Sequence, residues 1–308
     1  MMRYKKINFV RVILISNLLL IIIGIFSQIM TSFDHNEHMY ITAGVLISKG
    51  FELYKDFAYL QMPYLPLLYG FLYKILSINS HYLFVGKLVS FIFIISSALI
   101  LFSLTKRIHQ NIEISIGIVT IFLLNSTIIC ASLEVSNYIG ALFFSLAGFY
   151  ITFISITNKS FKPFLVIFGG VFVGLSIGIK LTYAPILLPF LIMCLFYPRE
   201  RGYFGRNFNI LSLFVIGLII SLLPLLFFIR NWDIFLFNNL GYHSYNTTWR
   251  ILTDYPGPIT MFSKIKFFNH ILLKPETFLL NCKYLNKGAA INKILFSNIA
   301  NNLVCCNK

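Results

Sequence analysis

The chain has 308 residues, of which 58% are hydrophobic and only 11% are charged, and its formal net charge is +15. Its apolar residues fall in repeated runs of about 20, the length that crosses a bilayer, which excludes an ordinary water-soluble globular fold. Basic residues in such a chain mark cytoplasmic loops and lipid headgroup contacts, so we expect no nucleic-acid partner. The five cysteines have no paired spacing suited to zinc or to a disulfide framework.

Seven apolar runs predict an all-α fold, a polytopic transmembrane helical bundle. We place the spans at residues 8–30, 83–105, 112–130, 138–157, 163–179, 181–197 and 208–229. The first span follows a basic N-terminus, but its apolar region is too long for a signal peptide. We therefore expect it to remain as a membrane span.

The loop between the first two spans contains two predicted interfacial helices. In residues 34–50, "DHNEHMYITAGVLISKG", Ser32 or Asp34 offers a helix cap and Gly50 offers a stop. Residues 62–79 are short for a span, contain two prolines and a lysine, and carry tyrosines suited to the headgroup level. Both helices are therefore expected to lie along the membrane surface.

Charged residues are distributed unequally between the two ends of the predicted spans. Lysine and arginine gather at the N-terminus and in the connections after the second, fourth and sixth spans, which the positive-inside rule assigns to the cytoplasm. Seven of the ten acidic residues lie in the other loops: Asp34, Glu37, Glu52, Asp56, Glu134, Asp233 and Asp254. We therefore expect a cytoplasmic N-terminus and an acidic extracytoplasmic face.

The apolar pattern weakens after the seventh span, so we divide the chain into a membrane module at 1–230, an outer-face and interfacial segment at 231–280, and an unpatterned tail at 281–308. The middle segment includes a basic amphipathic stretch at 259–274, which is typical of a surface helix. The tail has no periodicity, which is expected either of a disordered end or of a truncated chain.

The stretch "FDHNEHMY" concentrates polar groups directly after the first span. On a helix, Asp34 shares a face with Glu37 at i, i+3 and with His38 at i, i+4. A carboxylate at this level can act as a general base or can organise a cation or sugar hydroxyls. The histidines also allow a divalent metal, although "DHNEH" has no established ligand spacing, and a solvated polar loop accounts for the same residues.

The chain from 36 to 73 resembles the first outer loop of the GT-C glycosyltransferases, in the bacterial family similar to protein O-mannosyltransferases and lipid A aminoarabinose transferases. The shared features are an acid opening a short helix, then a tyrosine, a glycine, a tyrosine with an aspartate, and two prolines, here Glu37, Tyr40, Gly50, Tyr54, Asp56, Pro63 and Pro66. "GGVFVGLSIGIKLTYAPILLP" resembles the family's glycine-rich fifth span, which runs to a lysine, here Lys180. The resemblance covers roughly residues 8–230.

This resemblance implies a seven-span enzyme that transfers a sugar, with inversion, from a polyprenyl-phosphate donor to a hydroxyl of a lipid, glycan or protein acceptor. In an alignment through Tyr40, Asn36 stands where the family has its catalytic aspartate. We therefore expect Asp34, the nearest aspartate, to be the base, with Glu37 as its partner. The expected substrate-binding residues are Asn36, His38, Tyr40, Tyr54, Lys55, Asp56, Glu134, Lys180 and Arg230.

Several of these residues have plainer explanations. Glu134 is also expected as an ordinary exposed loop acid, and Lys55, Lys180 and Arg230 either contact the donor phosphate or meet lipid headgroups. A transporter or flippase without chemistry, or an inactive truncated relative, are the alternatives at the level of the whole chain. In each case we expect an integral protein of a bacterial inner membrane with membrane lipids as partners.

Overall fold

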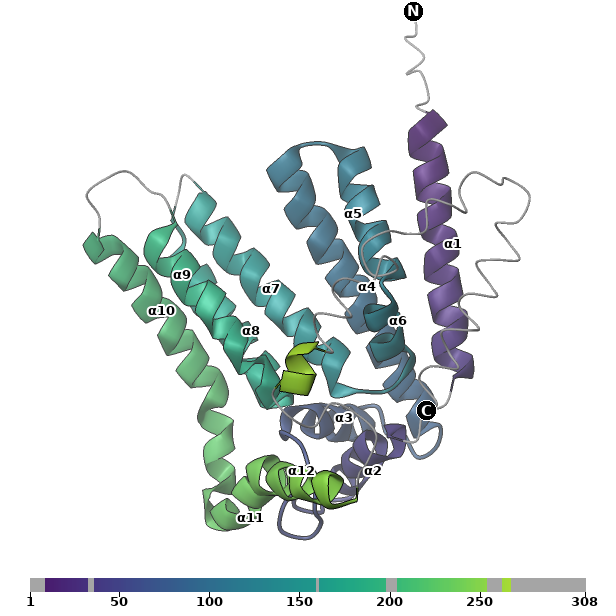
Figure 1. Ribbon diagram of the computed structural model, residues 1–308, viewed down its shortest axis with the longest axis vertical. Helices are drawn as coiled ribbons and strands as arrows, with labels where there is room; N and C mark the ends of the chain where they lie inside the picture. The colour runs from purple at the N-terminus through teal and green to yellow at the C-terminus, as the bar shows by residue number, and fades with distance from the viewer. Residues whose placement is uncertain (1–8, 33–35, 159–160, 198–203, 254–261, 267–308) are drawn as a thin grey trace, which may run out of the picture.

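The computed structural model describes residues 9–32, 36–158, 161–197, 204–253 and 262–266, and its regular elements are helices. A row of roughly parallel helices forms the body (Figure 1): α1 (Phe9–Thr31), α4 (Tyr82–His109), α5 (Ile112–Leu124), α7 (Asn137–Thr157), α8 (Pro163–Ile179), α9 (Leu187–Phe196) and α10 (Phe204–Leu222). Shorter helices gather at one end, which we call the site end: α2 (Glu37–Ser48), α3 (Tyr64–Ile75), α11 (Trp232–Leu236) and α12 (Tyr242–Leu252).

Four stretches within the described residues are long and apolar enough to cross a membrane: α1, α4, α7 and Asn207–Phe228. The helices α5 and α6 (Ser126–Leu133) pass the same test only as a pair, with a bend of 62° between them, as in a broken span or a re-entrant loop. The remaining two predicted spans form the shorter apolar helices α8 and Leu181–Phe196. The helical membrane bundle is thus confirmed, whereas the count of seven spans stays a prediction.

The break between α5 and α6 has a local cause in Asn125. Its side-chain oxygen accepts hydrogen bonds from the backbone N–H groups of Thr127 (3.0 Å) and Ile128 (3.2 Å). Asparagine in this position starts a new helix, because it satisfies amide groups that have no partner in the preceding turn. The predicted single span at 112–130 is therefore two helices.

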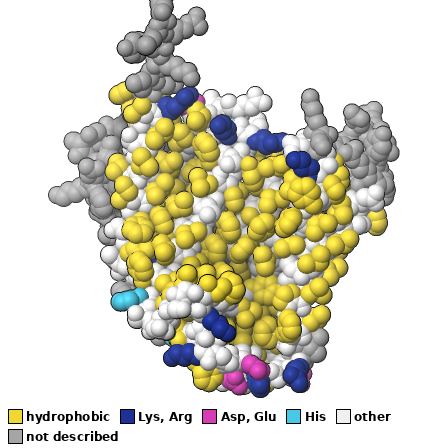
Figure 2. Space-filling view, turned by 180° about the vertical axis from the view of Figure 1, so that it is seen from behind, with side chains coloured by type: hydrophobic (Ala, Val, Ile, Leu, Met, Phe, Trp, Pro, Cys, Tyr) yellow, Lys and Arg dark blue, Asp and Glu magenta, His cyan; other side chains and the backbone are white. Residues whose placement is uncertain are grey.

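The surface of the bundle matches a lipid environment. Apolar side chains cover the long face in Figure 2, with lysine and arginine along one edge and charges of both signs at the site end. The edge opposite the site end includes Arg11, Lys106, Arg107 and Lys162, from the start of α1, the end of α4 and the connection that precedes α8. This distribution fits the predicted topology, in which that edge faces the cytoplasm.

Glycines allow the central helices to approach closely. A Cβ atom added at Gly170 of α8 would lie 2.0 Å from the carbonyl oxygen of Phe214, and one added at Gly217 of α10 would lie 1.9 Å from that of Ile167. Small residues of this kind let helix backbones pack against one another in membranes, where lipid tails supply no hydrophobic driving force.

The two interfacial helices form as predicted, with a different start. Helix α2 ends at Ser48, and Gly50 adopts φ +93° in the expected stop. Its N-cap residue is Asn36, without a side-chain cap bond, and Ser32 Oγ instead donates to the carbonyl oxygen of Leu133. Asp34, the other predicted cap, lies outside the described residues. Residues 267–308 and most of the predicted amphipathic stretch at 259–274 lie outside the described residues.

Candidate functional site

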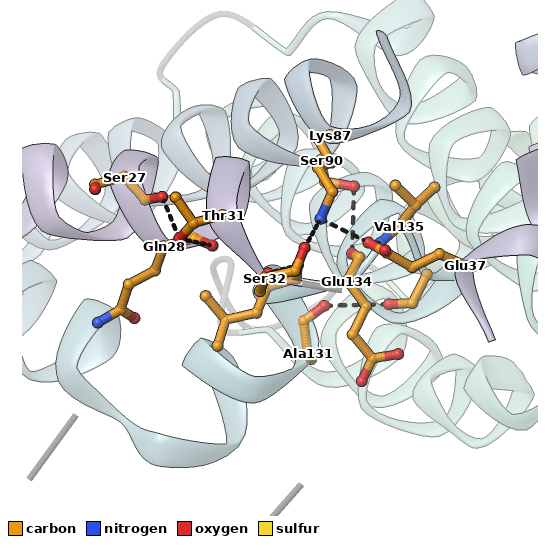
Figure 3. A network of polar contacts seen from close by, with 12 residues as sticks. Ser27, Gln28, Thr31, Ser32, Glu37, Lys87, Ser90, Ala131, Glu134 and Val135 are labelled. Carbon is orange, nitrogen blue, oxygen red and sulfur yellow. Dashed lines mark hydrogen bonds and ion pairs between the residues drawn. The ribbon is translucent and has the colours of Figure 1, made fainter. Parts of the chain in front are cut away.

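A buried ion pair lies at the junction of α2, α4 and the connection between α6 and α7 (Figure 3). Lys87 Nζ lies 2.9 Å from Glu37 Oε1, and both side chains are only 3% exposed. Lys87 also donates a hydrogen bond to the carbonyl oxygen of Ser32 (2.6 Å), and Glu37 Oε1 accepts one from the backbone N–H of Val135 (2.9 Å). The pair thus joins segments far apart in sequence.

The contacts of Glu37 are those of a structural residue, whereas the sequence predicted a partner of the catalytic base. Its carboxylate is enclosed by Lys87 and by the Val135 amide, and the residue is 2% exposed. A carboxylate held in this way anchors the start of α2, and breaking such a pair leaves an uncompensated buried charge. Direct contact between Glu37 and a substrate does not fit this geometry. Asp34, the expected base, lies outside the described residues.

The other residues predicted in α2 divide between surface and core. Asn36 and His38 are exposed. His38 borders a shallow pocket of about 230 Å³ that Phe57 and Tyr59 also line. Tyr40 is buried, and its ring lies edge-on to that of Tyr59 with centroids 6.4 Å apart. The structure therefore leaves Asn36 and His38 accessible to a ligand and places Tyr40 in the core.

Tyr54 packs the loop after α2 against the segment at 228–239. It is buried with φ +65°, its hydroxyl donates to the carbonyl oxygen of Gln61, and Asn239 Nδ2 donates to that hydroxyl at 3.4 Å. The ring packs edge-on against Phe228 and Phe235. Burial raises the pKa of Tyr54 well above its usual value. These contacts occupy the hydroxyl and make Tyr54 part of the framework.

A groove beside this loop brings together two of the predicted phosphate partners. It has a volume of about 690 Å³ and contains Lys55 and Arg230, together with Glu52. The other lining residues are mainly apolar: Ile47, Phe51, Leu53, Leu67, Phe227, Phe228 and Asn231. Glu52 Oε2 accepts a hydrogen bond from Lys55 Nζ at 2.9 Å, which raises the pKa of Lys55. The groove thus combines two cationic side chains with largely apolar walls.

Asp56 stands next to the groove without lining it. Its Oδ2 accepts a hydrogen bond from the backbone N–H of Glu52 at 2.7 Å, and the residue is exposed. This contact closes the turn that presents Lys55.

Lys180 lies in a separate polar cluster, between α8 and the 3-10 helix η1 (Leu181–Ile186). Its Nζ donates to Asn137 Oδ1 at 2.9 Å and lies 3.2 Å from the centroid of the Tyr138 ring. Asn137 in turn donates to Gln61 Oε1 at 3.1 Å. Burial lowers the pKa of Lys180 to about 8, and the nearby charge of the half-buried Glu134 opposes that shift. Lys180 therefore neighbours Glu134 and does not line the groove.

The described residues contain no group of three histidine, cysteine, aspartate or glutamate side chains that could hold a metal ion. Asp34 and His35 lie outside that part of the chain, so the metal hypothesis for "DHNEH" stays a prediction. No family model, curated protein or solved structure matches the chain.

The sequence reasoning missed three residues that build this end of the molecule: Gln61, Lys87 and Asn137. A signal existed for Lys87, because a single lysine inside an apolar run is a functional or structural site by default. The two amides carry no such signal, since their partners are set by the packing of distant helices.

Proposed function

We propose that the chain is a membrane glycosyltransferase that moves a sugar from a polyprenyl-phosphate donor to a hydroxyl acceptor at the site end. The groove of Lys55 and Arg230 is the observation that carries this proposal. A lipid phosphate needs cationic hydrogen-bond donors for its head and an apolar wall for the first units of its tail. Two cations beside Phe227 and Phe228 offer both within one cavity.

The chemistry assigned to this site is an in-line displacement. A carboxylate removes the proton of the acceptor hydroxyl while its oxygen attacks the anomeric carbon, and the lipid phosphate departs with the bonding electron pair. Lys55 and Arg230 stabilise the charge that develops on the departing phosphate. Attack from the opposite side inverts the configuration of the sugar.

Asp34 is the proposed base, because Glu37 is held by Lys87. Glu134 is another acid near a cation at the site end, where its charge acts on Lys180. We assign it to acceptor or donor contact. The positive-inside rule puts this end outside the cytoplasm. A soluble nucleotide sugar does not reach that side, whereas a lipid-linked sugar arrives within the bilayer.

Purified protein in lipid nanodiscs with a polyprenyl-phosphate sugar is the direct test. Transfer to an acceptor hydroxyl is expected from this donor and not from a nucleotide sugar. Lys55→Ala should raise the donor KM several-fold, an effect limited by solvent screening of an exposed charge. Lys74→Ala is the matched control, because Lys74 is an exposed lysine at the end of α3 that does not line the groove. Transfer from a nucleotide sugar without a lipid carrier would contradict the proposal.

The base is tested by Asp34→Asn, which should lower kcat by roughly 10² to 10⁴, the usual contribution of a general base. Glu134→Gln is the comparison, with a smaller loss expected for a group that binds rather than takes the proton. Near-normal turnover of Asp34→Asn would move the assignment to another acid. Tight binding of polyprenyl phosphate without transfer to any acceptor would favour a transporter.

A further inference from the structure

We infer that Glu52 is a specificity-determining residue of the groove, which disfavours a lipid phosphate with two negative charges relative to one with a single charge. Because Lys55 and Arg230 are proposed to hold the donor phosphate, this role rests on the proposed function. It lets the groove distinguish the donor from the lipid phosphate that remains after the sugar has been transferred.

Glu52 lines the groove and is paired with one of its two cations. Its Oε2 accepts a hydrogen bond from Lys55 Nζ at 2.9 Å, and Arg230 lines the same groove. The hydrogen bond to Glu52 raises the pKa of Lys55, and the positive charge of Arg230 opposes that rise, so both charges act on Lys55. A lipid phosphate that binds Lys55 must therefore share its ammonium group with a carboxylate.

A short turn presents the carboxylate of Glu52 beside Lys55. The backbone N–H of Glu52 donates to Asp56 Oδ2 at 2.7 Å, and the charge of Asp56 also acts on Lys55. The two cations of the groove are thus opposed by Glu52 in its wall and by Asp56 next to it. A bound phosphate adds its charge to a group of four residues that has no excess positive charge.

The proposed reaction changes the charge of the lipid phosphate. The donor is a phosphodiester with one negative charge. As the acceptor oxygen bonds to the anomeric carbon, the bond from that carbon to the phosphate oxygen breaks and its electron pair stays on the phosphate, while the hydroxyl proton goes to the base. The lipid product is a phosphate monoester, whose second pKa of about 6 gives it nearly two negative charges at about pH 7.5.

The repulsion between Glu52 and a bound phosphate is proportional to the charge of the phosphate. It is therefore about twice as large for the product as for the donor. Because affinity depends exponentially on free energy, the factor by which Glu52 weakens product binding is about the square of the factor for the donor. Glu52 thus favours release of the product from a groove that still holds the donor.

The test measures the Kd of two lipids for the full chain in nanodiscs: a polyprenyl-phosphate sugar and the polyprenyl phosphate that it leaves. Glu52→Gln removes the charge and nearly keeps the size of the side chain. Two unit charges about 4 Å apart in water correspond to about five-fold in affinity, and an exposed pair contributes less. We expect Glu52→Gln to lower the donor Kd about three-fold and the product Kd about ten-fold, with both effects smaller at high salt.

Two further variants serve as controls. Glu113→Gln removes the acid of another ion pair, with Arg11 at 2.7 Å, at the end of the bundle opposite the groove (Figure 1). It should leave both Kd values unchanged. Lys55→Ala should raise both Kd values several-fold, which checks that the two lipids bind in the groove.

The outcomes separate this role from the proposed function. Glu52→Gln would overturn the inference if it tightened the binding of both lipids by the same factor or left both unchanged. Weaker binding of both lipids would also overturn it, because Glu52 would then orient Lys55 for the phosphate. Kd values that Lys55→Ala does not change would reject the groove as the donor site, and the inference with it. The larger gain for the product, in a protein that transfers no sugar, would reject the transferase and leave the charge selectivity of the groove standing.

Discussion

At the scale of single residues, Lys180 has a charge that changes within the range of pH used in ordinary assays. Burial lowers the pKa of its ammonium group to about 8, and Glu134 opposes the shift. The same shift raises the free energy of unfolding as pH increases from about 8 to 10.5, because the unfolded chain then keeps a proton that the folded chain has lost.

If Lys180 contacts the donor phosphate, the Kd for polyprenyl phosphate should rise as pH increases through about 8, where the amine loses its charge. Below that pH this group should add no pH dependence. Lys180→Arg should keep tight binding to higher pH, since guanidinium stays protonated. Fluorescence titration with the lipid between about pH 6.5 and 9.5 measures the Kd of the native protein and of the Lys180→Arg variant. Parallel pH profiles for the two proteins would show that Lys180 does not contact the phosphate.

The grouping of the candidate residues could be predicted only in part, because residue type indicates possible chemistry whereas burial depends on the fold. Lys55, Lys180 and Arg230 were expected to contact the donor phosphate together; the structure brings Lys55 and Arg230 to one groove, and Lys180 lies in a separate cluster. Glu37 was expected to face a substrate, because its loop is rich in charge. Its true surroundings come from Lys87 and Val135, 50 and 98 positions later in the chain, and no local spacing encodes such contacts.

At the scale of elements, the site end depends on how closely α2 and α3 cross. A Cβ atom at Gly44 would lie 2.6 Å from Cβ of Tyr69, and one at Gly70 would lie 2.5 Å from a methyl group of Ile47. The two glycines therefore set the separation of the helices, and with it the position of Ile47 and Leu67 in the groove wall.

Gly44→Ala should lower the free energy of unfolding by about 1–3 kcal/mol, the usual cost of overpacking. Gly117→Ala in α5 is the matched control, because no atom lies within 4 Å of its added Cβ. That change should be neutral or stabilising by up to about 1 kcal/mol, since alanine favours the helix. Thermal unfolding in detergent compares the two. Equal free energies of unfolding for Gly44→Ala and Gly117→Ala would mean that α2 and α3 can move apart without loss of stability.

Helices could be predicted better than their breaks. The run at 163–179 became α8 with the same bounds, because a continuous apolar stretch bounded by lysines leaves little choice. The breaks at Asn125 and in η1 were not predicted. A single cap or a proline such as Pro185 changes the backbone locally while the mean hydropathy of the run stays high.

At the scale of the whole molecule, the orientation of the bundle follows from its charged ends. Asp56 at the site end and Lys106 at the end of α4 are both exposed and lie at opposite ends of the structure. In a chain without native cysteines, Asp56→Cys should react with an impermeant maleimide added outside intact cells, and Lys106→Cys only after lysis. The reverse pattern would place the groove in the cytoplasm and remove the argument for a lipid-linked donor.

The number of crossings could not be predicted with the same success as the bundle itself. Composition alone shows that the chain must satisfy its backbone in lipid, which requires helices. Whether a short helix such as α9, with 10 residues, crosses alone or with η1 depends on neighbouring helices and on local bilayer thickness. A hydropathy profile contains information on neither the neighbouring helices nor the bilayer thickness.

The contact between Tyr54 and Asn239 also fixes an order of events during synthesis, since the two residues are 185 positions apart. Likewise, the hydroxyl of Tyr64 cannot donate its hydrogen bond to the carbonyl oxygen of Ser221 until that residue, 157 positions later, has been synthesised. At about 5–20 residues per second, translation needs roughly 10–40 s to cover the longer interval. The loop that bears Lys55 thus leaves the ribosome well before the later segments that complete its packing.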